Sequence, residues 1–294
     1  MAMHGGGGGG IGRVMPRVVV TGIGMVTPVG MCAASSWRGV LGTGGEEGVS
    51  SSGRGVSSLD NVDGFQWAAS LPSRVAGRVS AARAENDEEI EDALAGVEGF
   101  GSSGLTAPRF VRLAATAADE ALLDAQWRTR GDARREERTG VSLGNSIGSI
   151  DEVFRAGENA GLASSSSPGL ASVRKRLSPF FVPRVLVNMA AGAVSIRHAL
   201  RGPGAASGAA CAAGAHAILE AARVLRCGEA DVMLAGGTES CINVVTMAGF
   251  CRAKALSTAF NDDPSRASRP FDARRDGFVI AEGAAVRYHD TYTQ

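Results

Sequence analysis

Short apolar runs bounded by glycine recur along this chain and predict strands. The runs are continuous in apolar character rather than alternating, which is typical of strands buried on both faces of a sheet. The predicted strands are Arg17–Val20, Arg74–Val79, Arg138–Leu143, Ala205–Ala210, Asp231–Ala235 and Gly277–Ala281.

Between these runs, apolar residues recur at helical spacing. The pattern is clearest in Pro108–Gln126, where Phe110 and Leu113 begin an apolar face, and in Cys211–Arg226, which Gly228 follows as a C-cap. The other predicted helices are Ser35–Leu41, Glu85–Leu94, Ile150–Ala160 and Val182–His198. Strands that alternate with helices indicate an α/β layered domain, with helices covering both faces of the sheet.

The ends of the chain and one internal stretch do not show this periodicity. Residues 1–15 contain a run of glycines and are expected to be a disordered tail. Residues 42–103 are rich in Gly, Ser, Asp and Glu and read as a low-complexity insertion in a domain that spans 16–287. The apolar pattern stops after Val286, so residues 288–294 are expected to be a truncated end.

Composition fits a globular protein and excludes several classes of function. Hydrophobic residues make up 44% and charged residues 20% of the chain, and the formal net charge is zero. A neutral chain does not favour nucleic acid or an anionic membrane as a partner. No segment reaches the roughly 20 apolar residues of a transmembrane helix. The cysteines are odd in number and form no CxxC pair, which disfavours disulfides and a zinc site, so neither a metal nor a cofactor is predicted.

Cys211 is the candidate nucleophile. It is predicted to lie where a short small-residue strand gives way to a helix, and the unpaired N–H groups and dipole of a helix N-terminus favour a thiolate. The alanines and glycines around it leave room for a substrate carbonyl, and its own N–H group could donate to an oxyanion. The local pattern also fits a buried core cysteine, which is the usual state of a free cysteine.

Three other patterns were weighed as sources of chemistry. A cysteine hydrolase needs a histidine base, but His216 is turned by about 140° from Cys211 on a helix and reads as structural. Gly22-Ile23-Gly24 follows a strand as in dinucleotide-binding motifs, but Thr27 stands where the third glycine belongs. The cluster Arg174-Lys175-Arg176 reads either as a solvated loop or as a surface for an acidic partner.

Several longer blocks together resemble one family, the elongating type II β-ketoacyl-acyl-carrier-protein synthases. The blocks cover residues 17 to 286, and those from Arg138 onward are the most specific. They are 17–30, 178–183 (SPFFVP), 187–189 (VNM), 200–203 with Ala210-Cys211, 231–240 (DVMLAGGTES), 253–258 (AKALST), 268–272 (SRPFD) and 275–279 (RDGFV).

The resemblance implies a thiolase-like layered α/β/α fold, of which this chain is the first of two similar halves. It implies that Cys211 takes an acyl chain as a thioester, for condensation with malonyl-acyl carrier protein in fatty-acid biosynthesis. By the same resemblance, Ile147 and Phe250 line the acyl pocket. The basic residues Arg174, Lys175 and Lys254 would meet acyl carrier protein. A homodimer is implied where the full fold is present.

Two departures from the family leave alternatives open. The residues that flank the cysteine are alanines, and the histidines, lysine and glycine-rich loop of the family's second half have no counterpart here. We therefore expect either a fragment of an active 3-oxoacyl-[acyl-carrier-protein] synthase, which is an acyltransferase, or a non-catalytic partner that binds acyl carrier protein or a full-length synthase. Residues 238–241 and 249–254 favour a mitochondrial or plastid version, and a cytoplasmic bacterial-type enzyme is also compatible.

Overall fold

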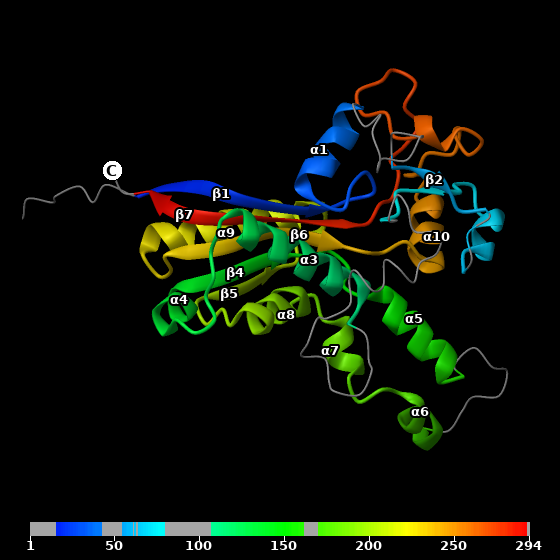
Figure 1. The fold of residues 1–294 in the computed structure, drawn as a ribbon. Helices are drawn as coiled ribbons and strands as arrows, with labels where there is room; N and C mark the ends of the chain where they lie inside the picture. Colours follow the sequence, from blue (N-terminus) through cyan, green and yellow to red (C-terminus); the bar gives the residue numbers. More distant parts are fainter. Residues whose placement is uncertain are drawn as a thin grey trace, which may run out of the picture.

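A mixed five-stranded sheet forms the centre of the molecule (Figure 1). A computed structural model describes residues 16–42, 55–60, 62, 64–79, 107–161 and 170–292. The strand order is β1-β7-β6-β4-β5. These strands are β1 (Arg17–Val26), β4 (Thr139–Gly144), β5 (Gly204–Ser207), β6 (Val232–Glu239) and β7 (Gly283–Tyr292). Strand β4 is parallel to β5 and β6, so the carboxyl ends of these three strands lie together at one end of the sheet.

Helices cover both faces of the sheet, which confirms the predicted α/β/α layering. Helices α3 (Arg109–Asp124) and α8 (Met189–His198) pack together on one face, and α9 (Ala213–Cys227) packs on the other. Strand β6 shows the two faces directly. Its Leu234 belongs to the core shared with α3, while the adjacent Met233 belongs to the core shared with α9. Continuous burial of this strand follows from helices on both sides.

The remaining elements lie mostly beyond the ends of the sheet. The shorter helices are α1 (Ala33–Leu41), α4 (Ala133–Arg138), α5 (Ile150–Asn159), α6 (Leu170–Arg176), α7 (Phe181–Val185) and α10 (Val244–Arg252). A small ribbon of β2 (Ser57–Ser58) and β3 (Val75–Ala76) and the turns η1 (Gln66–Ser70) and η3 (Pro264–Arg266) complete the fold outside the site. Figure 1 places α5, α6, α10 and β2 at the end where β4 and β6 finish.

Strand β1 is longer than the sequence predicted and is partly exposed. Gly22 and Gly24, which were predicted to follow the strand, lie inside it. A Cβ atom at Gly24 would lie 1.9 Å from the carbonyl oxygen of Ala117, and one at Gly22 would lie 2.4 Å from that of Ala121. These glycines therefore let α3 approach the sheet closely, and this packing replaces the dinucleotide interpretation.

The carboxyl-terminal strand begins later and runs farther than the sequence predicted. Residues Gly277–Ala281 make only isolated bridges, and β7 begins at Gly283. Residues 288–292, expected to belong to a truncated end, continue β7 between β1 and β6. Tyr288 and His289 are 3% and 4% exposed on opposite faces of the strand. Residues 288–292 are mostly polar, so the sequence carried no strand signal there. The segment is a strand because it pairs with neighbouring strands.

Other boundaries differ by a few residues. The region predicted as one helix, 182–198, is divided into α7 and α8, and Arg74–Val79 contributes only the two-residue β3. The helix predicted at Glu85–Leu94, the tail 1–15 and much of the insertion 42–103 lie outside the described residues. Within the described ranges, no helix is both long enough and apolar enough to span a bilayer.

Candidate active site

Cys211 lies at a sharp junction between strand β5 and helix α9. After Ser207 the chain passes into a single 3₁₀ turn, η2 (Ala210–Ala212), and α9 begins at the next residue. Ala210 has φ +47°, a left-handed conformation that costs a residue with a side chain about 1–2 kcal/mol. Cys211 is the middle residue of this strained turn and is exposed, so it is not packed in the core. The core-cysteine interpretation is therefore wrong.

Glycines on two strands hold the start of α9 against the sheet. A Cβ atom at Gly144, the last residue of β4, would lie 2.2 Å from the carbonyl carbon of Ala213. A Cβ atom at Gly237 on β6 would lie 3.1 Å from the Cα of Gly214. Larger residues at these positions would move the helix away from the strands, so the glycines set the position of Cys211.

The electrostatics of the junction come from the backbone. Helix α9 runs for four turns and ends at Gly228, which has φ +75° and caps it as predicted. Ala212 at its N-cap provides no side-chain acceptor for the first N–H groups. The positive end of the helix dipole therefore faces the turn that carries Cys211, and it favours negative charge there.

The predicted acyl-pocket residues lie on separate elements. Ile147 is 38% exposed and lies on the loop that follows β4. The amide of Asn145 in this loop donates to the carbonyl of Ser207 at 3.1 Å, which ties the loop to the end of β5. Phe250 lies on α10, half-buried, with its ring 5.2 Å from that of Phe278. The structure thus places Ile147 on a loop whose first residue, Asn145, bonds to the end of β5, and it places Phe250 against a separate apolar cluster.

The basic residues predicted to meet a carrier protein are exposed. Arg174 and Lys175 lie on α6, and Lys254 follows α10. Figure 1 shows α6 apart from α10, so these residues do not form one compact cluster in this chain. The sequence predicted a loop as one reading of this charge cluster. The structure places Arg174 and Lys175 on a helix instead.

The histidines do not form a base for Cys211 in the described residues. His216, which was read as structural, is exposed on α9. His198 pairs with Asp119, whose carboxylate lies 2.8 Å from its Nε2 atom. His289 is buried in β7, and burial lowers its pKa to about 4. A cysteine hydrolase mechanism has no histidine in position here.

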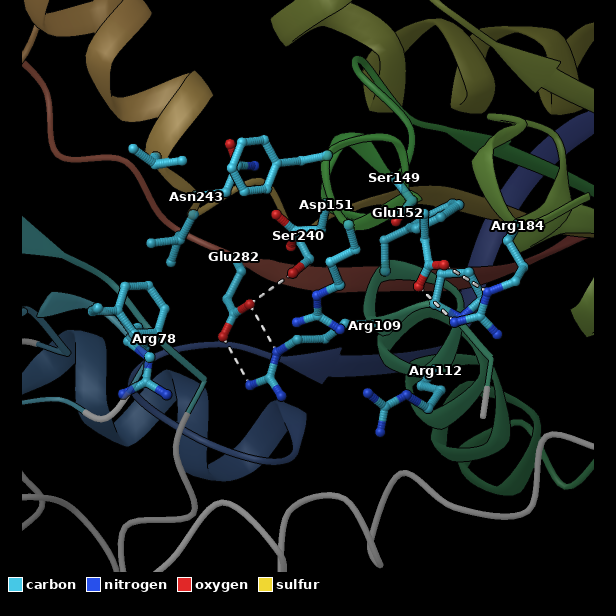
Figure 2. A pocket seen from close by; sticks show the side chains of 18 of the residues that line it. Arg78, Arg109, Arg112, Ser149, Asp151, Glu152, Arg184, Ser240, Asn243 and Glu282 are labelled. Carbon is cyan, nitrogen blue, oxygen red and sulfur yellow. Dashed lines mark hydrogen bonds and ion pairs between the residues drawn. The ribbon is translucent and has the colours of Figure 1, made fainter. Parts of the chain in front are cut away.

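A polar cavity of ≈ 930 Å³ lies near the end of β6 (Figure 2). Its lining includes the ion pair between Arg109 and Glu282, in which Nε and Nη2 of Arg109 each lie 2.9 Å from a carboxylate oxygen. Glu282 is 6% exposed and also accepts hydrogen bonds from the hydroxyl of Ser240 and the amide of Val79. Cys211 is not among the residues that line this cavity.

Sequence reasoning did not select Arg109, Glu282 or Glu239. A signal for Glu282 was present, because a single acidic residue within the apolar stretch Val279–Val286 indicates a buried and paired charge. Glu239 at the end of β6 carried no comparable signal, since its partners come from a loop more than ninety residues earlier in the chain.

Comparison with known proteins identifies the family. The model described as "Beta-ketoacyl synthase, N-terminal domain" matches residues 15–287, so the chain belongs to this family. It is 42% identical over 278 residues to the mitochondrial 3-oxoacyl-[acyl-carrier-protein] synthase of Arabidopsis thaliana, covering 94% of this chain and 56% of that protein. It is 40% identical over 272 residues to a putative mitochondrial synthase of the same name from Schizosaccharomyces pombe, covering 92% and 58%.

A solved structure agrees in fold. The crystal structure of a β-ketoacyl synthase from Burkholderia phymatum matches with a TM-score of 0.71 at 28% identity, covering 95% of this chain and 60% of that one. The fold is therefore the thiolase-like ketosynthase fold in its amino-terminal domain. The chain spans a little over half the length of the curated relatives it matches.

Proposed function

We propose that this chain is the nucleophile-bearing part of a 3-oxoacyl-[acyl-carrier-protein] synthase and that Cys211 accepts the acyl group. The observation that carries the proposal is the position of Cys211, exposed on a strained turn at the positive end of α9. Family membership and the names of the relatives support this choice over other cysteine chemistry.

The proposed step is transfer of an acyl group between two sulfur atoms. The Cys211 thiolate attacks the carbonyl carbon of the acyl thioester, and a new C–S bond forms. The C–S bond to the carrier's pantetheine breaks, and the pantetheine thiolate leaves and takes up a proton. The transition state carries negative charge on the carbonyl oxygen, which N–H groups at the turn and the dipole of α9 would stabilise. Condensation with malonyl-acyl carrier protein is proposed only for the whole enzyme.

Intact mass after incubation with an acyl-acyl carrier protein tests the acyl transfer. The native chain should gain the mass of one acyl group, and Cys211→Ala should gain none. Cys227→Ala is the matched control, because Cys227 is a second exposed cysteine, at the far end of the helix that follows Cys211. An adduct that persists in Cys211→Ala, or disappears in Cys227→Ala, would contradict the assignment.

Acyl carrier protein is the proposed partner, since the relatives are named for acting on it. The exposed side chains of Arg174, Lys175 and Lys254 support docking of an acidic protein. Reversing charge with Arg174→Glu and Lys175→Glu should weaken binding of the carrier and reduce its salt dependence. Arg134→Glu on α4 is the control, and equal binding by both variants would remove the proposed docking site.

A non-catalytic partner is the second candidate, because the exposed basic residues support docking whether or not Cys211 is acylated. Carrier binding without any adduct on Cys211 would favour this candidate. A mitochondrial location is proposed from the names of the relatives, and a homodimer is proposed from the family resemblance. Organelle fractionation and the mass of the native assembly in solution test these two points.

A further inference from the structure

The carboxylate of Glu239 collects hydrogen bonds from the loop that follows β4. Its Oε2 atom accepts from the backbone N–H of Ser146 at 3.1 Å and from that of Ile147 at 3.3 Å. The hydroxyl of Ser146 donates to the same oxygen. Glu239 is the last residue of β6, so one carboxylate fastens the loop after β4 to the end of the neighbouring strand.

The second oxygen of Glu239 completes this arrangement. Oε1 accepts from Nδ2 of Asn145 at 3.3 Å and from the backbone N–H of Ser240 at 3.2 Å. Asn145 is 2% exposed, its Nδ2 also donates to the carbonyl of Thr238 at 2.8 Å, and its Oδ1 accepts from the N–H of Gly148 at 2.5 Å. Asn145 therefore connects the start of the loop to β6 and its end to Gly148, and Glu239 binds the two residues between them.

The partners of the Glu239 carboxylate are neutral hydrogen-bond donors. Among the ion pairs within the described ranges, none involves Glu239. Hydrogen bonds to an ionised acceptor are roughly twice as strong as those between neutral groups. The carboxylate therefore stabilises a loop conformation in which the amides of Ser146 and Ile147 point inward, toward the end of β6.

This conformation leaves one side chain of the loop free for another contact. Asn145 and Ser146 use their polar groups on Glu239 and its strand, and Gly148 has none. Ile147 is 38% exposed, and the loop that carries it begins directly after Gly144, where α9 and its preceding Cys211 turn meet the sheet. A ligand that reaches this loop from Cys211 therefore meets a branched hydrocarbon surface.

We propose that Glu239 is a positioning residue that fixes Ile147 on the loop that starts where α9 meets the sheet, and that this position sets which acyl chains Cys211 accepts. The inference rests on the proposed acyl transfer to Cys211 and adds the residue that controls its selectivity. The ligand class is the hydrocarbon part of an acyl thioester, because the loop offers no free polar side chain to pantetheine. Glu239 acts through the loop and has no contact with the reacting atoms.

Hydrogen exchange of the full chain tests the attachment of the loop. In Glu239→Gln one acceptor becomes an NH₂ donor that meets other donors in either orientation, and the acceptor that remains is neutral, so exchange of the Ser146 and Ile147 amides should rise about tenfold. Glu239→Asp keeps the charge and should restore part of the protection. Glu137→Gln, which removes an exposed carboxylate on α4, should leave both amides unchanged. Equal exchange in native chain and Glu239→Gln would contradict the attachment.

Acylation with butyryl, octanoyl and palmitoyl pantetheine tests selectivity. The ratio of the palmitoyl rate to the butyryl rate on Cys211 should change about threefold or more in Glu239→Gln, because Ile147 is no longer held in place. Alkylation of Cys211 by iodoacetamide, which does not depend on chain length, should stay unchanged. An unchanged ratio in Glu239→Gln would overturn the positioning role alone. If no thioester acylates the native chain, the proposed acyl transfer to Cys211 and the proposed acyl-chain selectivity are both contradicted. Hydrogen exchange would still show whether Glu239 binds the loop.

Discussion

Around Cys211 the strands and α9 meet through glycines, whereas farther along the same end of the sheet Arg109 and Glu282 meet through a buried ion pair. At the first region, Gly144 and Gly237 let the backbone of α9 contact the strands directly. At the second, Glu282 precedes β7 and joins the start of α3 to Ser240. The comparison shows two ways to fix the end of a sheet, one through close backbone packing and one through paired charges.

Gly144→Ala should have the largest effect on acylation of Cys211, because its new Cβ would lie 2.2 Å from the backbone of Ala213. The start of α9 must shift, so we expect acylation of Cys211 to fall by more than tenfold and the free energy of unfolding to fall by about 1–3 kcal/mol. Acylation rates and urea unfolding measure the two effects. Gly204→Ala on β5 is the control, since a Cβ there meets nothing within 4 Å. Equal losses in both variants would contradict the packing argument.

Glu282→Ala should destabilise the fold while leaving the geometry at Cys211 largely intact. The buried carboxylate of Glu282 is the acceptor shared by Arg109, Ser240 and the Val79 amide, so its removal should cost about 3 kcal/mol. Urea unfolding should show this loss. Asp231→Ala breaks the exposed pair with Arg138 and should cost less than about 1 kcal/mol. If the two variants unfold at the same urea concentration, the buried pair does not hold this region.

His289 makes stability depend on pH in a predictable direction. Burial lowers its folded pKa to about 4, so between pH 6.5 and pH 4 the unfolded chain binds a proton that the folded chain does not. Its contribution is present above the unfolded pKa and is lost as pH falls through this window, by about 3 kcal/mol. His289→Leu should therefore lose less stability on acidification than the native chain. Parallel pH curves for the two proteins would show that His289 does not titrate as described.

Ala210→Gly should have the smallest effect. Glycine adopts the left-handed conformation of this turn without steric cost, and its greater freedom in the unfolded chain offsets part of the gain, so stability should rise by about 0.5 kcal/mol. Ala215→Gly within α9 should lower stability by about 1 kcal/mol. Thermal unfolding of both variants would reveal the opposite signs, and a loss in Ala210→Gly would argue against strain at the turn.

Strongly patterned elements were predictable from the chain alone. The helix found at Arg109–Asp124 has apolar residues at helical spacing, and the strand found at Val232–Glu239 contains a continuous apolar run. Gly228 caps α9 as predicted. Strand β7 and the full length of β1 were not predictable. Their glycines and polar residues become strand only because neighbouring strands and α3 bury them. The roles predicted for Ile147, Phe250, Arg174, Lys175 and Lys254 stay predictions.

The order of residues determined the layered α/β class, the family and the candidate nucleophile, because these depend on local periodicity and short motifs. The tertiary structure decided the strained conformation of Ala210, the contact between Gly144 and Ala213, and the attachment of the Ile147 loop to Glu239. These features join residues that lie far apart in the chain or depend on how closely two backbones approach. Local sequence patterns do not encode such distances, so only the packed fold brings the site together.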